Sequence, residues 1–544
     1  MPMDHSDSQH ASTALDAPSG GLLARSPEWT AKLVEFASIG VLSEVIYLAF
    51  VMAFPLAPNT EGAHVVYDLE KLARDSRWLA VLYFGGLVAL FVMFWRVIQV
   101  AREIEQACHT AARRRAFKLI ILAFGLLFGF TLVWLYPITA NDLFRYVLRG
   151  RIWAVYGASP MLHPPNDFPQ DPYISFAGEF GDWVSGYGPL WEVLVQAPLR
   201  LGATDMTRGA VSLKLVALCF YLVSALLIGW SVRCGDKNGH RDRWTRPAGL
   251  LLFAWNPMVL IEGMGNGHND MVLIASLVAG LLLWERRLWW ATALALSLAA
   301  MTKATGLLTL PIFGVVLLRE ERTWRRRFIK AMVVACIFLA IAFVSYRALG
   351  PVEDTIRGVR DMLTTRRGYA IASAVRVVLR EVVPENITEP IPRVTGQYLF
   401  ALFYAGLLWR VWCGKLNLYA AAFLAYFAQL IYGATFRVWY PIWLVPLAAL
   451  YAAPAMTWRM LLFSFSGEMY VLNTFLWRWW LSGWEWVKVG STVRQWLVIN
   501  LLGVPWFMFP LFGPIVIRWR RKYLARRKYG HPNVCAQYQR GEEP

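Results

Sequence analysis

Apolar runs separated by short polar connections repeat along most of the chain. A helix needs about 20 apolar residues to cross a membrane, and fourteen runs approach that length. They cover residues 34–54, 78–99, 118–137, 209–231, 248–263, 270–285, 288–302, 304–318, 328–349, 397–412, 417–434, 438–453, 460–476 and 495–517. This pattern predicts an all-α integral membrane protein, a polytopic helical bundle of about 13–14 transmembrane helices.

Arg and Lys gather in alternate connections between these runs. The clusters occupy residues 113–118, 233–246, 286–287, 319–330 and 518–528. Because cytoplasmic connections carry an excess of Lys and Arg, these five clusters belong in the cytoplasm. Strict alternation of fourteen spans puts them all on one side. We therefore expect both termini in the cytoplasm and two long connections, 139–208 and 350–395, outside it.

The chain divides into six parts on this basis. They are a disordered cytoplasmic tail (1–30), two N-terminal transmembrane helices (31–117), a membrane module with the long external loop 139–208 (118–350), an external interfacial loop (351–396), a C-terminal transmembrane module (397–518) and a basic cytoplasmic tail (519–544). Within the first external loop, Gly188 to Leu201 is apolar enough for a re-entrant or interfacial helix. The Arg-rich segment 357–380 is typical of helices lying in the interface.

Composition agrees with a membrane location. The chain is 57% hydrophobic and only 17% charged, whereas soluble domains are about 25% charged. The net charge of +18 would suggest nucleic acid in a soluble protein. Here the basic residues lie between spans, so we expect a lipid bilayer and no nucleic acid as partner. The six cysteines form neither a metal-binding pair nor an external disulfide framework.

Ionisable residues stand out where they interrupt this pattern. Just after the third span, Asp142 precedes Arg145 by three residues, which on a helix places both on one face. Alone, the pair is also typical of an interfacial salt bridge or a helix cap. Further on, Tyr187 and Trp191 flank a Gly-Pro step that starts a helix, where an anion can bind, although a structural turn explains this step equally.

The densest polar cluster lies between the fifth and sixth spans, at Gly265-Asn266-Gly267-His268-Asn269-Asp270. Ionisable residues at membrane depth are costly and mark functional sites, although a tight turn with an Asp cap is the simpler alternative. Lys303 interrupts another apolar stretch, and Arg437 lies among aromatics that also suit an interface anchor. The predicted topology places all of these residues outside, whereas a transporter places its polar residues near the midplane.

Three stretches resemble the GT-C fold glycosyltransferases, and within them the polyprenyl-phosphate-mannose-dependent mannosyltransferases (the alpha-1,6-mannosyltransferase group and glycosyltransferase family 87). They are Asp142-Leu143-Phe144-Arg145-Tyr146 with Arg149-Gly150-Arg151, then Tyr187-Gly188-Pro189-Leu190, then the central block of Asn256-Pro257, Gly265 to Asp270 and Lys303-Ala304-Thr305. The stretch from Arg437 to Pro446 is also similar. The central block is specific, and the first two spans are additional to the family's usual first helix.

The resemblance implies a GT-C-like fold, a lipid-phosphate sugar donor and inversion at the anomeric carbon, at the outer face of a prokaryotic plasma membrane. Asp142 matches the family's catalytic carboxylate. In the resulting hypothesis, Arg145, Lys303 and Arg437 bind the donor phosphate, and the sugars contact Tyr187, Trp191, Asn266, His268, Asn269 and Asp270. The acceptor is a hydroxyl of a glycan or glycolipid, and the sugar is expected to be mannose. We expect no metal and no cofactor.

Three alternatives remain at this point. A transporter or flippase of a lipid-linked sugar shares the lipid groove and the cations but needs no base, and it predicts an inverted repeat that the sequence lacks. A GT-C enzyme with another donor, such as a pentosyltransferase, differs only in the sugar. A non-catalytic scaffold leaves the convergence of polar residues unexplained.

Overall fold

The computed structural model describes residues 27–61, 77–107, 110–231, 246–357, 390–432, 436–451 and 453–476, and a few isolated positions between 512 and 519. Every regular element in these segments is a helix, apart from one bridge that pairs Pro55 with Leu135. The predicted all-α fold is therefore confirmed. The N-terminal tail up to residue 26, most of the interfacial loop 351–396, the span 495–517 and the C-terminal tail lie outside the described residues.

Five of the described helices are long and apolar enough to cross a membrane. They are α1 (Pro27–Ala53), α3 (Arg77–Gln106), α4 (Ala111–Val133), α7 (Met206–Trp230) and α13 (Trp324–Arg347). Each coincides with a predicted span. Side chains of Thr110, Asp205 and Thr323 cap α4, α7 and α13 by accepting a hydrogen bond from a backbone N–H of the first turn, which satisfies a donor that the helix itself cannot use.

Other predicted spans coincide with further helices. They are α10 (Asp270–Glu285), α11 (Trp289–Thr302), η5 (Ala304–Leu308) with α12 (Thr309–Glu320), α17 (Pro390–Trp412), α18 (Leu418–Tyr432), η6 (Tyr440–Trp443) with α19 (Leu444–Tyr451), and α20 (Pro454–Leu476). The breaks before α12 and α19 bring polar residues to the ends of short apolar helices.

The predicted span 248–263 is a bent pair of helices that together are long and apolar enough for one span. Helix α8 (Arg246–Ala254) ends before Asn256-Pro257, and the chain bends by 50° into α9 (Pro257–Leu260) and the π-helical turn η4 (Ile261–Gly265). The bend has a local cause, because proline offers no N–H to the preceding turn and Asn256 caps the new helix at the N–H of Met258, 3.0 Å away. The bend directs the polar loop 265–270 toward α5.

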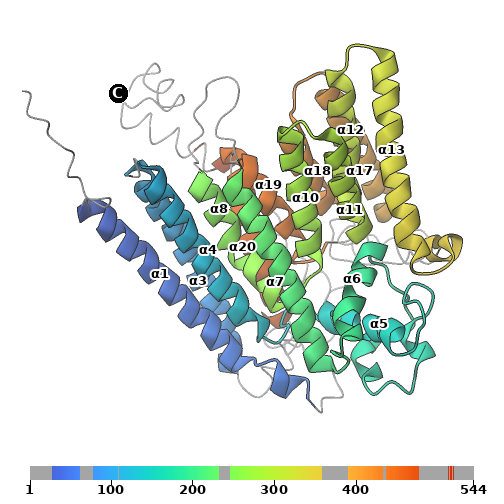
Figure 1. The fold of residues 1–544 in the computed structure, drawn as a ribbon. Coiled ribbons are helices and arrows are strands. Elements are labelled where there is room, and N and C mark those ends of the chain that lie inside the picture. The colour runs from blue at the N-terminus through green and yellow to red at the C-terminus, as the bar shows by residue number, and fades with distance from the viewer. Residues whose placement is uncertain are drawn as a thin grey trace, which may run out of the picture.

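The long connection between α4 and α7 is folded rather than extended. It contains α5 (Asp142–Ala154), η2 (Pro165–Asp167), η3 (Ile174–Phe180) and α6 (Pro189–Arg200). Helix α6 confirms that residues 188–201 are helical. Helices α5 and α6 pack together at the lower end of the bundle in Figure 1, and the turn between α12 and α13 lies at the opposite end.

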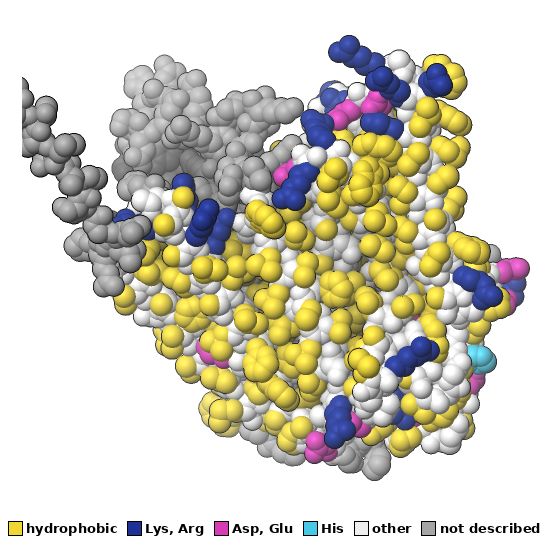
Figure 2. Space-filling model, viewed as in Figure 1, with side chains coloured by type: hydrophobic (Ala, Val, Ile, Leu, Met, Phe, Trp, Pro, Cys, Tyr) yellow, Lys and Arg dark blue, Asp and Glu magenta, His cyan; other side chains and the backbone are white. Residues whose placement is uncertain are grey.

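The outer surface of the bundle is apolar. Exposed large hydrophobic side chains line α1, α3, α4, α7 and α13, and they cover most of the face in Figure 2. Helix α13 buries none of its residues. A soluble protein rarely exposes a continuous apolar surface of this size, so this surface is the part of the protein that faces lipid.

Helix α8 approaches α19 closely at Gly249. A Cβ added there would lie 2.5 Å from the backbone oxygen of Ala449, whereas one added at Gly314 would meet nothing within 4 Å. We expect Gly249→Ala to destabilise the protein by about 1–3 kcal/mol through overpacking and to lower the midpoint of thermal unfolding in detergent. The control Gly314→Ala should keep or raise that midpoint, and equal midpoints for both variants would contradict this packing argument.

Candidate active site

Asp142 is the first residue of α5, which follows the short connection after α4. An acidic residue is favourable in the first turn of a helix because the turn's free N–H groups are partly positive. Its Oδ1 lies 2.9 Å from Nη1 of Arg145. Arg145 also donates to Oδ1 of Asn141 at 2.6 Å and lies 3.8 Å from the ring centre of Phe180. The predicted pairing of Asp142 with Arg145 on one helical face is present.

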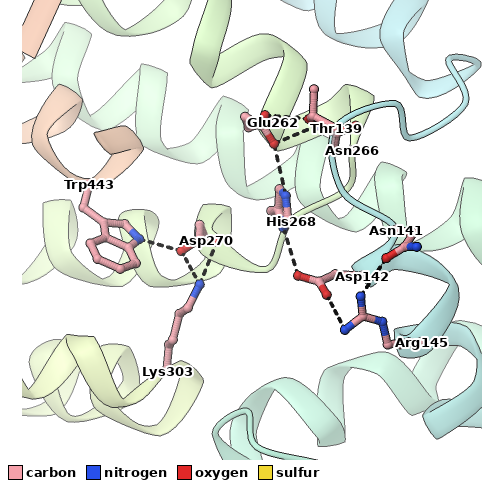
Figure 3. Close-up of polar contacts among 10 residues, drawn as sticks. All are labelled: Thr139, Asn141, Asp142, Arg145, Glu262, Asn266, His268, Asp270, Lys303 and Trp443. Atoms are coloured by element: carbon pink, nitrogen blue, oxygen red, sulfur yellow. Dashed lines mark hydrogen bonds and ion pairs between the residues drawn. The ribbon is translucent and has the colours of Figure 1, made fainter. Parts of the chain in front are cut away.

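The loop 265–270 brings His268 to Asp142 (Figure 3). Gly267 has φ 70°, a conformation that glycine adopts without strain, and a Cβ there would press on Leu143 at 2.9 Å. The turn thus lies directly against α5. Nδ1 of His268 is 3.9 Å from Oδ2 of Asp142, and the imidazole stacks on Trp439 with ring centres 4.3 Å apart.

Glu262 is the residue that the sequence analysis missed. It is fully buried in the π-helical turn. Its Oε1 accepts from Thr139 at 2.8 Å, and its Oε2 accepts from Asn266 at 2.7 Å and lies 3.1 Å from Nε2 of His268. The signal was available, because an ionisable residue inside a predicted span is functional by default. It was overlooked because Glu262 stands alone in an apolar run.

A second ion pair lies beside this group. Nζ of Lys303 is 2.8 and 3.0 Å from the two carboxylate oxygens of Asp270, and Asp270 also accepts from the indole N–H of Trp443. The same ammonium lies 5.1 Å from the ring centre of Tyr440 and 5.3 Å from that of Trp443. Lys303 and Asp270 are therefore held rigidly in a buried aromatic setting.

The turn at residues 185–188 docks onto the Lys303 segment. The N–H of Gly188 donates to the carbonyl of Thr302 at 3.0 Å, and a Cβ at Gly188 would lie 1.9 Å from the carbonyl oxygen of Met301. The following residues pack inward, with the rings of Tyr187 and Trp191 about Tyr146. Trp191 is fully buried and packs its ring on Tyr146, so its expected stacking on a sugar stays a prediction.

The two asparagines of the loop differ in their contacts. Nδ2 of Asn266 donates to Glu262 and Thr139, and its Oδ1 accepts from the N–H of Ile138 at 3.0 Å. Asn266 therefore ties the loop to the segment before Asp142 and has little capacity left for a sugar. Asn269 is 1% exposed, and neither its Oδ1 nor its Nδ2 has a hydrogen-bond partner among the described residues.

The electrostatic setting of Asp142 is strongly positive. Burial alone would raise the pKa of this carboxyl, but the positive charges around it, with that of Arg145 the largest and those of Arg437 and Lys303 adding to it, outweigh burial and hold its pKa well below the usual range. Asp142 is thus an anion surrounded by cations. Such a set of preorganised cations can also stabilise the charge that develops on a leaving phosphate.

Most of the predicted site residues come together. Asp142, Arg145, His268 and Arg437 form one group, and Asp270 and Lys303 form the adjoining ion pair. Tyr187 adjoins them through Tyr146, while Asn266 and Trp191 support the group from behind. Among the described residues, no group of three or more His, Cys, Asp or Glu side chains could hold a metal ion.

Comparison with known proteins matches this chain to the model of one protein family. The model of the family described as alpha-(1→6)-mannopyranosyltransferase, N-terminal domain, matches residues 38–319. This range includes Asp142, Glu262, His268 and Lys303, and it ends before Arg437.

Three curated relatives are similar at low identity. Alpha-(1→6)-mannopyranosyltransferase A of Mycobacterium tuberculosis is 25% identical over 371 residues, which are 66% of this chain and 67% of the relative. Alpha-(1→6)-mannopyranosyltransferase B of Corynebacterium glutamicum is 23% identical over 58% of this chain and 56% of the relative. The A protein of the latter organism is 23% identical over 33% and 35%. Because the family model covers more than half of the chain, the chain belongs to the alpha-(1→6)-mannopyranosyltransferase family of glycosyltransferases.

Proposed function

We propose that this protein is an inverting membrane glycosyltransferase that moves mannose from a polyprenyl-phosphate donor to a hydroxyl of a glycan or glycolipid acceptor on the extracytoplasmic face. The observation that carries the proposal is the buried carboxylate of Asp142, held among the positive groups Arg145, Lys303 and Arg437 and 3.9 Å from the imidazole of His268. A base beside cations is what transfer from a phosphate leaving group requires.

The reaction is a single displacement. The acceptor oxygen attacks the anomeric carbon, the bond from that carbon to the phosphate oxygen breaks, and the electron pair leaves with the lipid phosphate. Asp142 accepts the hydroxyl proton. Lys303 and Arg437 stabilise the phosphate, and Arg145 joins them by exchanging one carboxylate oxygen for a phosphate oxygen. This exchange also leaves Asp142 a stronger base, because it loses part of the positive charge that lowers its pKa.

Asn269 is the leading candidate to bind a sugar hydroxyl. A buried amide without partners costs free energy, and a hydroxyl can both donate to and accept from it. Tyr187, His268 and Asp270 adjoin the same space, and Asp270 also fixes the ammonium of Lys303.

The location of the site supports a lipid donor and the external face. Helix α5 lies at the end of the bundle opposite the turn between α12 and α13 (Figure 1). The residues at and beside this turn are basic, with Arg319 at the end of α12, Arg322 in the turn and Arg325, Arg326 and Arg327 at the start of α13. By the positive-inside rule, the basic end is cytoplasmic. Helix α13 exposes large apolar side chains and packs against α6, so an isoprenoid chain can approach α6 from the bilayer.

The alternative functions require different residues or substrates. A flippase needs no base, and family membership favours an enzyme over a flippase or a scaffold. A pentosyltransferase would use the same base and cations, so only the donor sugar separates it from a mannosyltransferase.

The first experiment measures transfer from radiolabelled polyprenyl-phosphate-mannose to a panel of glycan and glycolipid acceptors, with purified protein in nanodiscs. Wild type should transfer label, and Asp142→Asn should lose about 10²–10⁴-fold of the rate, which is what a general base contributes. The control Asp205→Asn changes an exposed helix cap in the same loop and should retain activity. Equal transfer by wild type and Asp142→Asn would remove Asp142 from the mechanism, and transfer from a pentose donor alone would identify a pentosyltransferase.

Arg145 should set the acidic limit of activity. Its charge lowers the pKa of Asp142, so in Arg145→Gln that pKa rises and the base becomes protonated at higher pH. The acidic limb of the kcat/KM profile should therefore move to higher pH. The control Arg208→Gln removes an exposed arginine whose partner is Asp205, 3.4 Å away, and should leave the profile in place. An unmoved limb in Arg145→Gln would contradict this account.

Asn269 and Asn266 should respond differently to truncation. Asn269→Ala should lower kcat/KM by about tenfold, as expected for one or two lost hydrogen bonds to substrate, without lowering the thermal midpoint. Asn266→Ala should lower that midpoint, because it leaves buried partners unpaired at about 1–3 kcal/mol. A loss of stability in Asn269→Ala with normal kinetics would show that its amide serves the fold.

A further inference from the structure

Asp142, His268 and Glu262 form a row of three ionisable groups (Figure 3). They come from α5, the loop 265–270 and the π-helical turn. The imidazole lies between the two carboxyl groups, with Nδ1 3.9 Å from Asp142 and Nε2 3.1 Å from Glu262. His268 and Glu262 are both fully buried, so their interaction is shielded from water and stronger than at a surface.

We propose that Glu262 is a positioning residue that orients His268 to take over the proton from Asp142, so that His268 is the second proton acceptor of the reaction. This inference rests on the proposed function and deepens it. The sequence had suggested that His268 contacts the sugar, whereas its place between two carboxyl groups points to proton transfer.

The tautomer of His268 follows from its neighbours. A neutral imidazole has one N–H and one bare nitrogen. Both nitrogens face a carboxyl group, but Nε2 is 3.1 Å from Glu262 whereas Nδ1 is 3.9 Å from Asp142. The proposal therefore assigns the hydrogen to Nε2, at the shorter contact, and leaves the lone pair of Nδ1 facing Asp142. Neither ring nitrogen makes a well-directed hydrogen bond among the described residues. Contacts of this kind are often long before substrate binds and shorten in the complex.

Glu262 is suited to carry the negative charge that this role needs. The carboxyl group of Glu468 on α20 lies beside it, and two adjacent buried carboxyl groups cannot both ionise readily. Glu262 receives hydrogen bonds from Thr139 and Asn266 and faces His268. The proposal therefore places the negative charge on Glu262, which these hydrogen bonds stabilise.

The three groups of this row account for the path of the proton from the acceptor hydroxyl to water. The acceptor hydroxyl gives its proton to Oδ2 of Asp142 as the new glycosidic bond forms and the phosphate leaves. Asp142 passes the proton to Nδ1 of His268 and returns to the carboxylate. The imidazolium then lies between two carboxylates and stacks on Trp439, both of which stabilise a cation. It gives the proton to external water when the products leave.

The same row explains how a carboxylate with a lowered pKa can serve as a base. Asp142 holds a proton weakly because of the cations around it. A second acceptor at Nδ1 removes the need for Asp142 to keep that proton. Glu262 supplies the compensating charge, as the buried carboxylate does in serine hydrolase triads.

Glu262→Gln tests the role by removing charge without changing shape. We expect kcat to fall by about 100-fold, the lower end of what proton transfer contributes, while KM for the donor stays close to that of wild type. The matched control is Glu44→Gln on α1, because Glu44 is also buried and accepts a hydrogen bond from a threonine, Thr131. Glu44→Gln should transfer mannose at the wild-type rate. Unchanged kcat in Glu262→Gln, or a rise in KM alone, would overturn the proposal.

A second measurement does not depend on activity. Solid-state NMR of ¹⁵N-histidine-labelled wild type in nanodiscs, with His268 assigned by its missing signals in His268→Gln, should show the hydrogen on Nε2 and a bare Nδ1. The opposite tautomer would overturn the proposal even if Glu262→Gln fails to fold. Absence of transfer by wild type would instead count against the proposed function, and the tautomer would then decide alone whether Glu262 orients His268.

Discussion

The site depends on one constraint, which is that charge removed from water must be compensated within the protein. Asp142 is buried at the end of a bundle with an apolar outer surface, and an isolated carboxylate there would be protonated or would destabilise the fold. The cations around Asp142 keep it ionised. They come from four segments separated in sequence, so the charge of one aspartate ties α5, the loop 265–270, the start of η5 and the segment before η6 into one arrangement.

The break between α8 and α9 meets a second constraint, which is that polar backbone within a membrane bundle has to be covered by protein. Irregular backbone is tolerated there only where protein covers it or a cavity receives it. Asn256-Pro257 ends α8, and the π-helical turn that follows offers Glu262 and the loop 265–270 to the site. The hydrogen bonds of Glu262 and Asn266 to Thr139 then join this turn to the segment that leads into α5.

Membership of the family and the geometry of the site bear on different parts of the function. The family model covers α1 through most of α12, and it accounts for sugar transfer. The route of the proton that we propose rests on the arrangement of Asp142, His268 and Glu262, which sequence similarity at 23–25% identity does not address. The sequence suggested that the first two spans are an addition to the family, but the family model starts at residue 38 and includes most of α1 and all of α3. These two helices pack on α4 and α8.

The sequence by itself determined the fold class, most helix positions and the residues that stand out chemically. It could do so because apolar runs have to match the thickness of a membrane, and isolated ionisable residues break those runs visibly. Only the tertiary structure decided which of these residues meet. The bend at Asn256-Pro257 places Glu262 behind His268, and packing buries Trp191 against Tyr146. Such outcomes depend on contacts between distant segments, and hydrophobic periodicity along one segment carries no information about them.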